Sequence, residues 1–410
     1  VGIQLKSRDT FEVQDSMVEL SELIKTAGGV VAGEGIQKLD SPNSGTFIGT
    51  GKAAEYADFC KRNDVDTVIF DDELTPAQAK NLEKIFDCKV IDRTSLILDI
   101  FAQRAKTKEG KLQVELAQLK YLLPRLTRFW EHLSRQKGGI GMRGDGETQL
   151  ETDRRRVQDR ISRITDDLEE VRQNRTIQRQ GRQRHNWPLA SIVGYTNAGK
   201  TTLLNCLTDA NGFAEDKLFA TLDPMTRRLR LPTNQNVLLS DTVGFIKKLP
   251  HRLVEAFKAT LEEVVQADLL INVVDISHPQ ANEQILAVNS VLEEIGASEK
   301  PTLVVFNKID RLMNGEIPPH WNEMFPNSIF VSAKTGDGIN ELLNSIGYML
   351  KPARLFVEIL IPHNNPALAA KVYHIGQVVE KQYENDGVRF KVRLPPFVIS
   401  EFQNYLVKTL

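Results

Sequence analysis

The sequence predicts an α/β protein in which mixed domains are joined by a pair of long helices. Three observations lead to this fold class. Short apolar runs alternate with helical patterns at the start of the chain, regularly spaced leucines occupy its middle, and glycine-rich turns follow apolar runs in its second half. A chain of 410 residues has room for roughly two to four domains of ordinary size.

Composition excludes several classes of protein. A hydrophobic content of 41% and a net charge of −2 are typical of a globular chain. Three cysteines are too few for a disulfide framework or a zinc site and favour a reducing compartment. No apolar run reaches the ~18 residues that a membrane span needs, and no signal peptide opens the chain. We expect a cytoplasmic monomer, and we expect a short N-terminal piece to be missing because the sequence begins at Val1.

The first segment, residues 1–106, has the pattern of a parallel sheet flanked by helices. The apolar runs VGIQL, DTVIF and CKVID alternate with helical patterns such as TPAQAKNLEKIF. Within it, Gly49, Gly51 and Lys52 are expected to end a strand and open a helix, where free backbone N–H groups could bind phosphate. A solvated turn explains the same residues, and we favour that interpretation.

Residues 107–184 have the spacing of a helical hairpin. Apolar residues at alternating intervals of four and three predict a helix over about 111–136: Leu112, Leu116, Leu119, Leu123, Leu126, Trp130 and Leu133. The same spacing returns at Val157, Ile161, Ile164, Leu168 and Val171. The two helices are expected to pair antiparallel, each about 35–40 Å long, with GGIGMRGDGE at the tip.

The hairpin also has an unusual charge distribution. Between Arg104 and His185 there are 20 Lys and Arg against 12 Asp and Glu, and the segment ends in the basic run RTIQRQGRQRH. A rigid spacer with a solvated face would explain the charges alone. The bare glycine tip favours RNA, because glycine lets backbone approach closely while an arginine contacts phosphate or stacks on a base. The candidate RNA-contacting residues are Gly139, Gly141, Arg143, Gly144 and Gly146.

A phosphate-binding loop follows, in a third segment over residues 185–351. Gly194, Gly199, Lys200 and Thr201 have the spacing GxxxxGKT directly after the apolar run SIV. In such a loop the backbone N–H groups surround the β-phosphate, the lysine reaches the β and γ oxygens, and the threonine hydroxyl ligates Mg²⁺.

Three further motifs identify the nucleotide as GTP. LLSDTVGF places Asp241 where a carboxylate can hold Mg²⁺ through water, and Gly244 where its N–H meets the γ-phosphate. VVFNKID and FVSAK each follow or end an apolar run, and Asp310 can accept two hydrogen bonds from guanine that adenine cannot donate. Four motifs in this order predict a Ras-like P-loop GTPase domain.

The candidate site residues follow from these motifs. The predicted nucleotide contacts are Gly194, Tyr195, Thr196, Asn197, Ala198, Gly199, Lys200, Thr201, Thr202, Asp241, Thr242, Val243, Gly244, Asn307, Lys308, Asp310, Ser332, Ala333 and Lys334. Thr201 and Thr221 are the predicted Mg²⁺ ligands, with Thr226 as the competitor of Thr221 in the switch segment FATLDPMTRRL. Lys200, Thr221 and Gly244 are the predicted catalytic groups.

Phe245 follows Gly244, where many Ras-like proteins carry a water-orienting glutamine. Because a phenyl ring cannot hydrogen-bond to the attacking water, intrinsic hydrolysis is expected to be slow until a partner aligns that water.

Together, GGIGMRGDGETQLETDRR, VGYTNAGKTTLLN, FATLDPMTRR and DTVGFIKKLPHRLVEAFKATLEE closely resemble the HflX family of bacterial-type ribosome-binding GTPases, from about Gly45 to Lys334. The resemblance implies a protein that binds the large ribosomal subunit and splits stalled or idle ribosomes. It further implies that the glycine-rich loop reaches the peptidyl-transferase region of the rRNA and that the ribosome stimulates hydrolysis.

The last segment, residues 352–410, reads as strand, helix, two strands around an Asn-Asp-Gly turn, and a helix, which predicts a small α+β domain. Two alternatives remain beside ribosome splitting. One is a GTP-gated RNA-binding clamp with little turnover, and the other is a GTPase that acts on ribosomal precursors.

Overall fold

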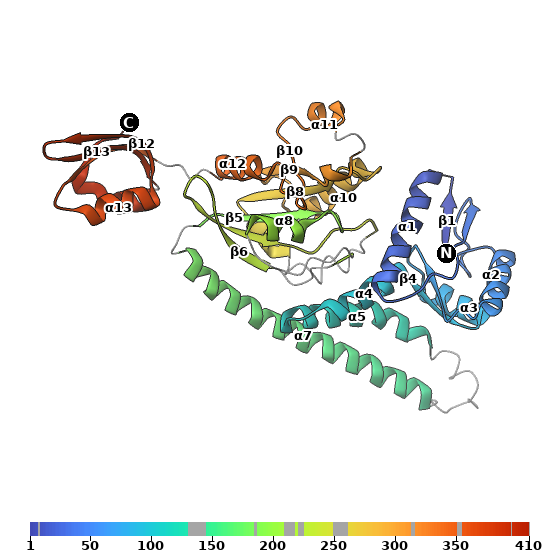
Figure 1. Cartoon of the computed structure of the whole chain (residues 1–410). Coiled ribbons are helices and arrows are strands. Elements are labelled where there is room, and N and C mark those ends of the chain that lie inside the picture. Colours follow the sequence, from blue (N-terminus) through green and yellow to red (C-terminus); the bar gives the residue numbers. More distant parts are fainter. Residues whose placement is uncertain are drawn as a thin grey trace.

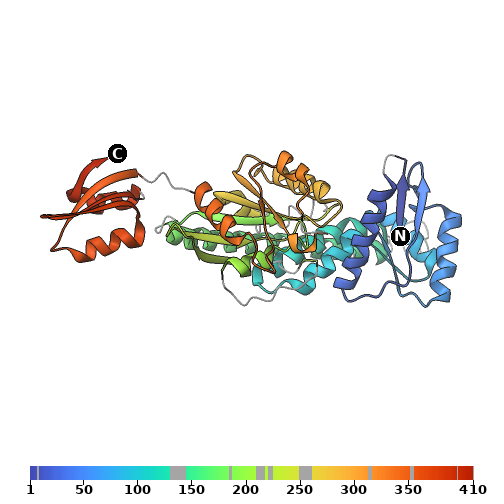
Figure 2. The ribbon, with the colours of Figure 1, turned by 45° about the horizontal axis from the view of Figure 1, so that its top comes forward.

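The computed structural model describes residues 1–6, 9–129, 145–183, 187–208, 218–219, 225–248, 261–312, 316–350, 355–394 and 396–409. Figures 1 and 2 show a mixed N-terminal domain, a pair of long helices, a central α/β domain and a small C-terminal domain at the far end of the central one. This is the predicted fold class. Among the described helices, none combines the length and the apolarity that crossing a bilayer requires.

The N-terminal domain alternates strands and helices as the sequence predicts. Its elements are β1 (Gly2–Leu5), α1 (Thr10–Thr26), β2 (Ile36–Leu39), α2 (Thr50–Arg62), β3 (Thr67–Phe70), α3 (Pro76–Phe86), β4 (Lys89–Asp92) and α4 (Arg93–Arg104). β1 pairs with β2 and β3 pairs with β4, both in parallel. Backbone hydrogen bonds of Val1 with Ile69 and Asp71 join the two strand pairs.

The glycine-rich turn at Gly49 differs in part from its prediction. α2 begins at Thr50 as expected, but the preceding residues form a turn closed by an isolated bridge between Asn43 and Phe47 rather than a strand. Lys52 donates to Glu55 at 2.7 Å, one turn further along the helix. The favoured interpretation of a solvated turn is therefore consistent with the structure.

The predicted hairpin is present as α5 (Lys108–Phe129) and α7 (Asp145–Gln183). Leu112, Leu116 and Ile164 form its buried seam, with Leu119, Ile161 and Leu168 packed against them. Figure 1 shows the two helices running antiparallel. α7 has 39 residues, which makes it about 58 Å long and longer than expected. Most of the basic run RTIQRQGRQRH lies within this helix, which continues to Gln183.

The central domain, here called the G domain, is built on a six-stranded sheet of order β10-β9-β8-β5-β7-β6. All neighbouring strands are parallel except β6, which is antiparallel to β7. The strands are β5 (Leu189–Gly194), β6 (Met225–Arg230), β7 (Asn236–Asp241), β8 (Leu269–Asp275), β9 (Thr302–Asn307) and β10 (Ile329–Phe330).

Helices cover both faces of this sheet. α8 (Lys200–Leu207) and α12 (Ile339–Met349) contribute leucines and isoleucines to the core on one face, together with side chains of β5, β7, β8 and β9. α10 (Ala281–Glu294) and residues 261–266 pack on the other face, while η1 (Ile309–Arg311) and α11 (Pro319–Met324) lie beyond β9. The reversal of strand order beside β5 places the ligand crevice at the carboxyl ends of β5, β7, β8 and β9.

The C-terminal domain is a four-stranded antiparallel sheet of order β12-β13-β11-β14 with two helices. Its elements are β11 (Leu355–Pro362), α13 (Pro366–Ile375), β12 (Gln377–Glu384), β13 (Gly387–Leu394), α14 (Pro396–Phe402), η3 (Gln403–Tyr405) and β14 (Leu406–Thr409). The predicted order of elements is confirmed, and β14 is an addition that the sequence did not reveal.

One apolar cluster crosses the boundary between domains. Leu20, Leu23 and Phe101 of the N-terminal domain lie in the same buried cluster as Tyr195 and Phe219 of the G domain. The rings of Phe101 and Phe219 meet edge to face with centroids 4.7 Å apart. This shared core holds the N-terminal domain against the loops that surround the predicted phosphate site.

Candidate nucleotide-binding site

The phosphate loop lies between β5 and α8, at the carboxyl edge of the sheet. Gly199 caps α8 with φ of 91°, a left-handed conformation that favours glycine. A Cβ at this position would lie 2.3 Å from the Asn307 amide nitrogen, so the residue must be glycine for Asn307 to reach the loop. The geometry fits a loop that brings backbone N–H groups and a helix N-terminus to one point.

Lys200 is buried at the start of α8. Its ammonium donates to the carbonyl oxygens of Tyr195 at 2.7 Å and Gly194 at 3.1 Å. Burial lowers the pKa of Lys200 to about 8, with Asp241 opposing the shift and Lys308 adding to it. An anion at this position would hydrogen-bond to the charged ammonium and restore a higher pKa.

Thr201, Asp241 and Gly244 converge beside this lysine. The Thr201 hydroxyl donates to Asp241 Oδ2 at 2.7 Å, and Asp241 is fully buried at the end of β7. A Cβ on Gly244 would lie 3.0 Å from Lys200 Nζ and 2.8 Å from Thr196 Cγ2. The structure therefore brings together two of the motifs, which the sequence separates by about 40 residues.

The candidate base-recognition residues form a second cluster. Asn307 is 2% exposed, donates to the Ala198 carbonyl at 2.9 Å and accepts from the Ala333 N–H at 3.0 Å. Asp310 accepts from the Ser332 hydroxyl at 2.6 Å. Lys308 adopts a left-handed conformation and pairs with Asp275 at 2.7 Å. The amide of Asn307 thus ties both base-recognition motifs to the phosphate loop.

The remaining predicted contacts are distributed as follows. Thr196 and Ala198 are buried, Asn197 is exposed in a left-handed conformation, and Thr202 is half-buried on α8. Thr242 donates to the Ile192 carbonyl at 2.8 Å, and Val243 belongs to the cluster shared with the N-terminal domain. Lys334 is exposed, one residue beyond buried Ala333.

The switch segment is described only at its two ends. Thr221, the preferred Mg²⁺ ligand, lies outside the described residues. Thr226 lies on β6 opposite Ser240, and its hydroxyl donates to Glu263 at 3.4 Å. Phe219 at the start of the segment is 2% exposed in the interdomain cluster.

Phe245 is 2% exposed and packs with Val193, Leu261 and Leu270 beneath the sheet. Its backbone carbonyl accepts from the Thr196 N–H at 2.7 Å, and its N–H donates to the Gly194 carbonyl at 3.1 Å. The ring therefore serves as a core residue and offers no hydrogen bond to a water molecule.

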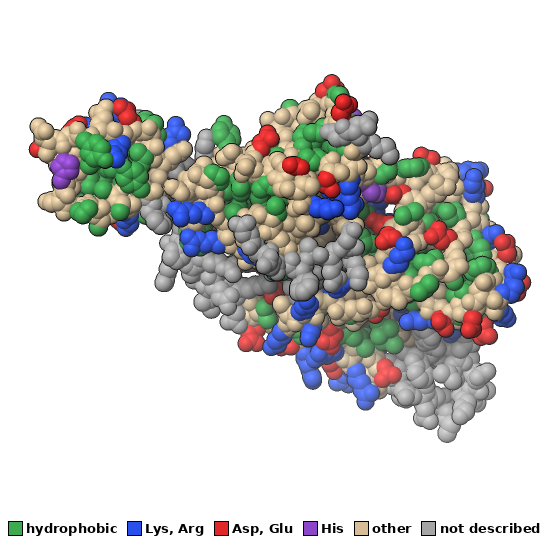
Figure 3. All heavy atoms as spheres, in the orientation of Figure 1, with side chains coloured by type: hydrophobic (Ala, Val, Ile, Leu, Met, Phe, Trp, Pro, Cys, Tyr) green, Lys and Arg blue, Asp and Glu red, His purple; other side chains and the backbone are tan. Residues whose placement is uncertain are grey.

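The predicted RNA-contacting tip falls largely outside the described residues, which do not include Gly139, Gly141, Arg143 and Gly144. Gly146 is placed in the first turn of α7 rather than in a loop. On the face that Figure 3 shows, Lys and Arg are interspersed with Asp and Glu along the coloured part of the hairpin.

A polar network that no sequence motif indicated joins the two domains. The Tyr195 hydroxyl donates to Glu19 on α1 and accepts from the Lys247 N–H at 2.7 Å. Lys248 pairs with Asp71 and, at 2.9 Å, with Asp72 at the end of β3. Two adjacent lysines directly after DTVGFI could have indicated a charged contact at this point. Glu19 gave no such indication, because it lies in an ordinary amphipathic helix.

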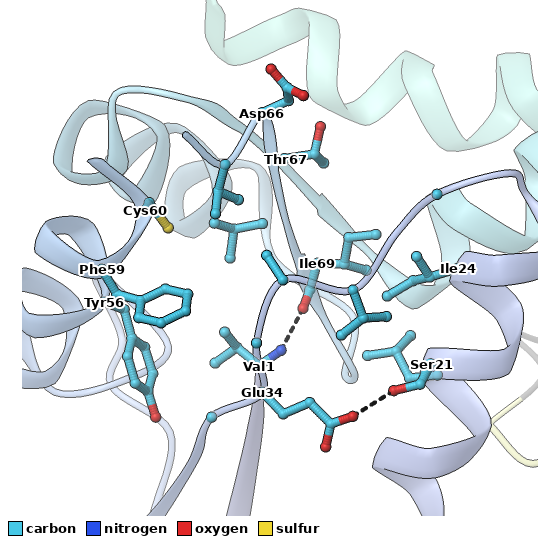
Figure 4. A pocket seen from close by; sticks show the side chains of 18 of the residues that line it. Val1, Ser21, Ile24, Glu34, Tyr56, Phe59, Cys60, Asp66, Thr67 and Ile69 are labelled. Carbon is cyan, nitrogen blue, oxygen red and sulfur yellow. Dashed lines mark hydrogen bonds between the residues drawn. The ribbon is translucent and has the colours of Figure 1, made fainter. Parts of the chain in front are cut away.

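A separate cavity of about 940 Å³ lies in the N-terminal domain, and every residue that lines it falls between Val1 and Asp99. Figure 4 shows Tyr56, Phe59 and Cys60 on one side and Ile24 with Ser21 on the other, where Ser21 donates to Glu34 at 2.8 Å. Since none of the lining residues belongs to the G domain, this cavity is distinct from the phosphate loop.

Three family models match successive parts of the chain. Residues 14–102 match the N-terminal region of a GTP-binding GTPase, residues 104–182 match its middle region, and residues 190–308 match a 50S ribosome-binding GTPase.

Two relatives align with nearly the whole chain. The GTPase HflX of Caldanaerobacter subterraneus subsp. tengcongensis is 47% identical over 97% of this chain and 91% of its own length. The GTPase HflX of Escherichia coli K12 is 48% identical over 93% of this chain and 90% of its own. A GTP-binding protein of Sulfolobus solfataricus, solved in complex with GDP, is 27% identical with a TM-score of 0.45, over 85% of this chain and 97% of that one.

Proposed function

Because the chain belongs to the HflX family of GTPases, which bind and hydrolyse GTP, we propose that it binds the large ribosomal subunit and splits stalled or idle ribosomes into subunits. The observation that carries this proposal is the joining of a GTPase site to a long helical hairpin in one chain. A nucleotide site alone would support many cellular roles, whereas a stiff pair of helices with a glycine-rich connection is suited to reach into folded RNA.

The hairpin supplies reach. α5 and α7 are held together by the leucine and isoleucine seam and by Arg160, whose guanidinium donates to Glu115 at 2.7 and 2.8 Å. Figure 1 shows the pair extending away from the G domain. We propose that Gly139, Gly141, Arg143, Gly144 and Gly146 contact rRNA of the peptidyl-transferase region, because glycines leave the backbone accessible and arginine can bind phosphate or a base face.

The GTPase site supplies the switch. We propose that the N–H groups of the phosphate loop and the Lys200 ammonium hold the β- and γ-phosphates, and that Gly244 donates its N–H to the γ-phosphate. Asp310 would accept two hydrogen bonds from guanine, with Asn307 and Ser332 holding the surrounding loops in place.

Mg²⁺ is a proposed cofactor. A hydroxyl and a carboxylate oxygen 2.7 Å apart, on Thr201 and Asp241, form a set of hard oxygen donors of the kind that Mg²⁺ prefers. We propose that Thr201, with Thr221 from the switch segment, holds the ion while Asp241 acts through water. The ion would neutralise charge on the phosphates when bound.

Slow intrinsic turnover is expected because buried Phe245 cannot align the attacking water. We propose that contact with the large subunit completes this alignment. The test is to compare GTP hydrolysis with and without purified large subunits. A rate that does not rise would contradict ribosome stimulation and would favour a clamp with little turnover.

Splitting itself is tested by light scattering of intact ribosomes after the protein is added with GTP or a non-hydrolysable analogue. A fall in scattering is expected, and ribosomes that stay intact would favour a role on ribosomal precursors instead. Arg143→Ala should abolish the effect while leaving guanine-nucleotide binding intact. The matched control is Arg163→Ala, which removes an exposed arginine from the middle of α7.

A further inference from the structure

The segment that follows Gly244 is bonded to the phosphate loop by three hydrogen bonds. Two of them join backbone groups: Phe245 N to the Gly194 carbonyl at 3.1 Å, and Thr196 N to the Phe245 carbonyl at 2.7 Å. The third joins the Lys247 N–H to the Tyr195 hydroxyl at 2.7 Å. Only this third bond depends on a side chain, so only it can be removed by a conservative substitution.

The tyrosine hydroxyl is oriented from the N-terminal domain. It donates to Glu19, and an ionised carboxylate can only accept. With its single proton committed to Glu19, the phenol oxygen offers a lone pair to the Lys247 N–H. Tyr195 is 5% exposed, and burial, followed by the charge of Glu19, raises the pKa of the phenol, which keeps it a donor.

Glu19 is fixed in turn by a buried arginine. Arg93 is 2% exposed and pairs both with Glu19 and, at 2.7 Å, with Asp71. Asp71 also accepts from the Ser16 hydroxyl at 2.7 Å and pairs with Lys248. The network therefore holds the segment after Gly244 at two successive residues, through the backbone of Lys247 and the side chain of Lys248.

An apolar cluster also joins the segment around Gly244 to the N-terminal domain. Val243 and Ile246, on either side of Gly244, lie in one cluster with Leu20 and Leu23 of α1. Phe219, at the start of the switch segment FATLDPMTRRL, belongs to the same cluster. The switch segment and the segment around Gly244 therefore share a core with the N-terminal domain, and a shift of either must repack it.

We propose that Tyr195 is a positioning residue for GTP hydrolysis: its hydroxyl, oriented by Glu19, holds the backbone at Lys247 so that Gly244 stays aligned with the γ-phosphate. Turnover of GTP thereby depends on docking of the N-terminal domain. The proposal goes beyond ribosome binding and concerns hydrolysis in the absence of ribosomes, so its failure and that of the ribosome proposal can be told apart.

The first test is Tyr195→Phe in the full chain, assayed without ribosomes. We expect kcat to fall about fivefold to thirtyfold, as the loss of a buried hydrogen bond implies, while KM for GTP and the affinity for GDP stay within about twofold. Tyr383→Phe, which removes a hydroxyl from a tyrosine that is 72% exposed, is the matched control and should leave kcat unchanged. An unchanged or increased kcat in Tyr195→Phe would overturn the proposal.

A second measurement separates positioning from general weakening of the fold. Hydrogen exchange should show loss of protection at the Lys247 amide in Tyr195→Phe, with the amides of β5 unaffected. Glu19→Ala should lower kcat as much as Tyr195→Phe. Glu19→Gln should lower it less because its amide oxygen still accepts, and Glu22→Gln on the exposed face of α1 should have no effect.

The double variant Tyr195→Phe/Glu19→Ala should be no slower than either single variant within about twofold, because both substitutions remove the same interaction. Multiplicative effects, or unchanged protection at Lys247, would refute the coupling.

Discussion

The base-recognition end of the nucleotide site is built from the G domain, whereas the phosphate end is shared with the N-terminal domain. The described hydrogen bonds of Asn307 and Asp310 go to Ala198, Ala333 and Ser332. The loops around Gly244, in contrast, are tied through Tyr195 and Lys248 to α1 and β3. The difference suggests that selection of guanine depends on the G domain alone, whereas turnover of GTP depends also on the N-terminal domain.

The largest expected effect comes from Asp310→Asn. An amide would present a donor to the donors of guanine, so GTP affinity should fall by at least about a thousandfold, and xanthine nucleotides should bind instead. Equilibrium binding of guanine and xanthine diphosphates measures this exchange. If base recognition is independent of hydrolysis at the phosphate end, the variant should hydrolyse XTP with a kcat close to that of the unmodified protein with GTP. A kcat that collapses with both nucleotides would contradict the comparison.

Gly244→Ala tests the phosphate end directly. The added Cβ would meet Thr196 Cγ2 at 2.8 Å and Lys200 Nζ at 3.0 Å, so the backbone around Gly244 must move. Since small displacements of a positioned group are costly, kcat should fall about a hundredfold, with GDP affinity changed only severalfold. Single-turnover hydrolysis and GDP titration measure the two quantities. Gly51→Ala is the control, because a Cβ there meets nothing within 4 Å.

The pKa of Lys200 predicts a pH dependence confined to phosphate binding. Burial lowers this pKa to about 8, and bound phosphates should raise it, so binding takes up a proton wherever the free lysine has lost one. GDP affinity should therefore be flat below pH 8 and fall above it, by up to about tenfold per pH unit. Calorimetry in buffers of different ionisation enthalpy should show uptake of about 0.8 proton at pH 8.5 and about 0.1 at pH 7. Equal uptake at both values would show that the ammonium is not linked to the phosphates.

Lys248→Ala should have the smallest effect. Its ion pairs with Asp71 and Asp72 are partly exposed and screened, so kcat should fall no more than about threefold, and the deficit should shrink as salt weakens the same pairs in the unmodified protein. The measurement is kcat at increasing ionic strength. Lys391→Ala, which breaks the Glu380 pair of the C-terminal sheet at 2.7 Å, should not alter kcat at any salt concentration.

Much of the fold could be predicted because its signals are local. The seam of the hairpin is visible as leucines at intervals of four and three, and the four nucleotide motifs each follow or end an apolar run of the kind that forms a buried strand. Errors arose where local signals are weak. The strand before Gly49 is a turn, β14 was missed, and α7 is longer than expected because the basic run after Val171 continues it to Gln183, since arginine and glutamine favour helix.

The sequence by itself determined the proposed chemistry of the site, because a phosphate loop, an aspartate predicted to bind guanine and a position without a water-aligning side chain are each fixed by residue type and short spacing. Tertiary structure alone decided which domain contacts the segment after Gly244. Glu19, Tyr195 and Lys247 are separated by up to 228 positions in the numbering, and no periodicity relates them. They meet only because an apolar core shared by two domains brings α1 against the phosphate loop. Burial there raises the free-energy cost of breaking each hydrogen bond between them.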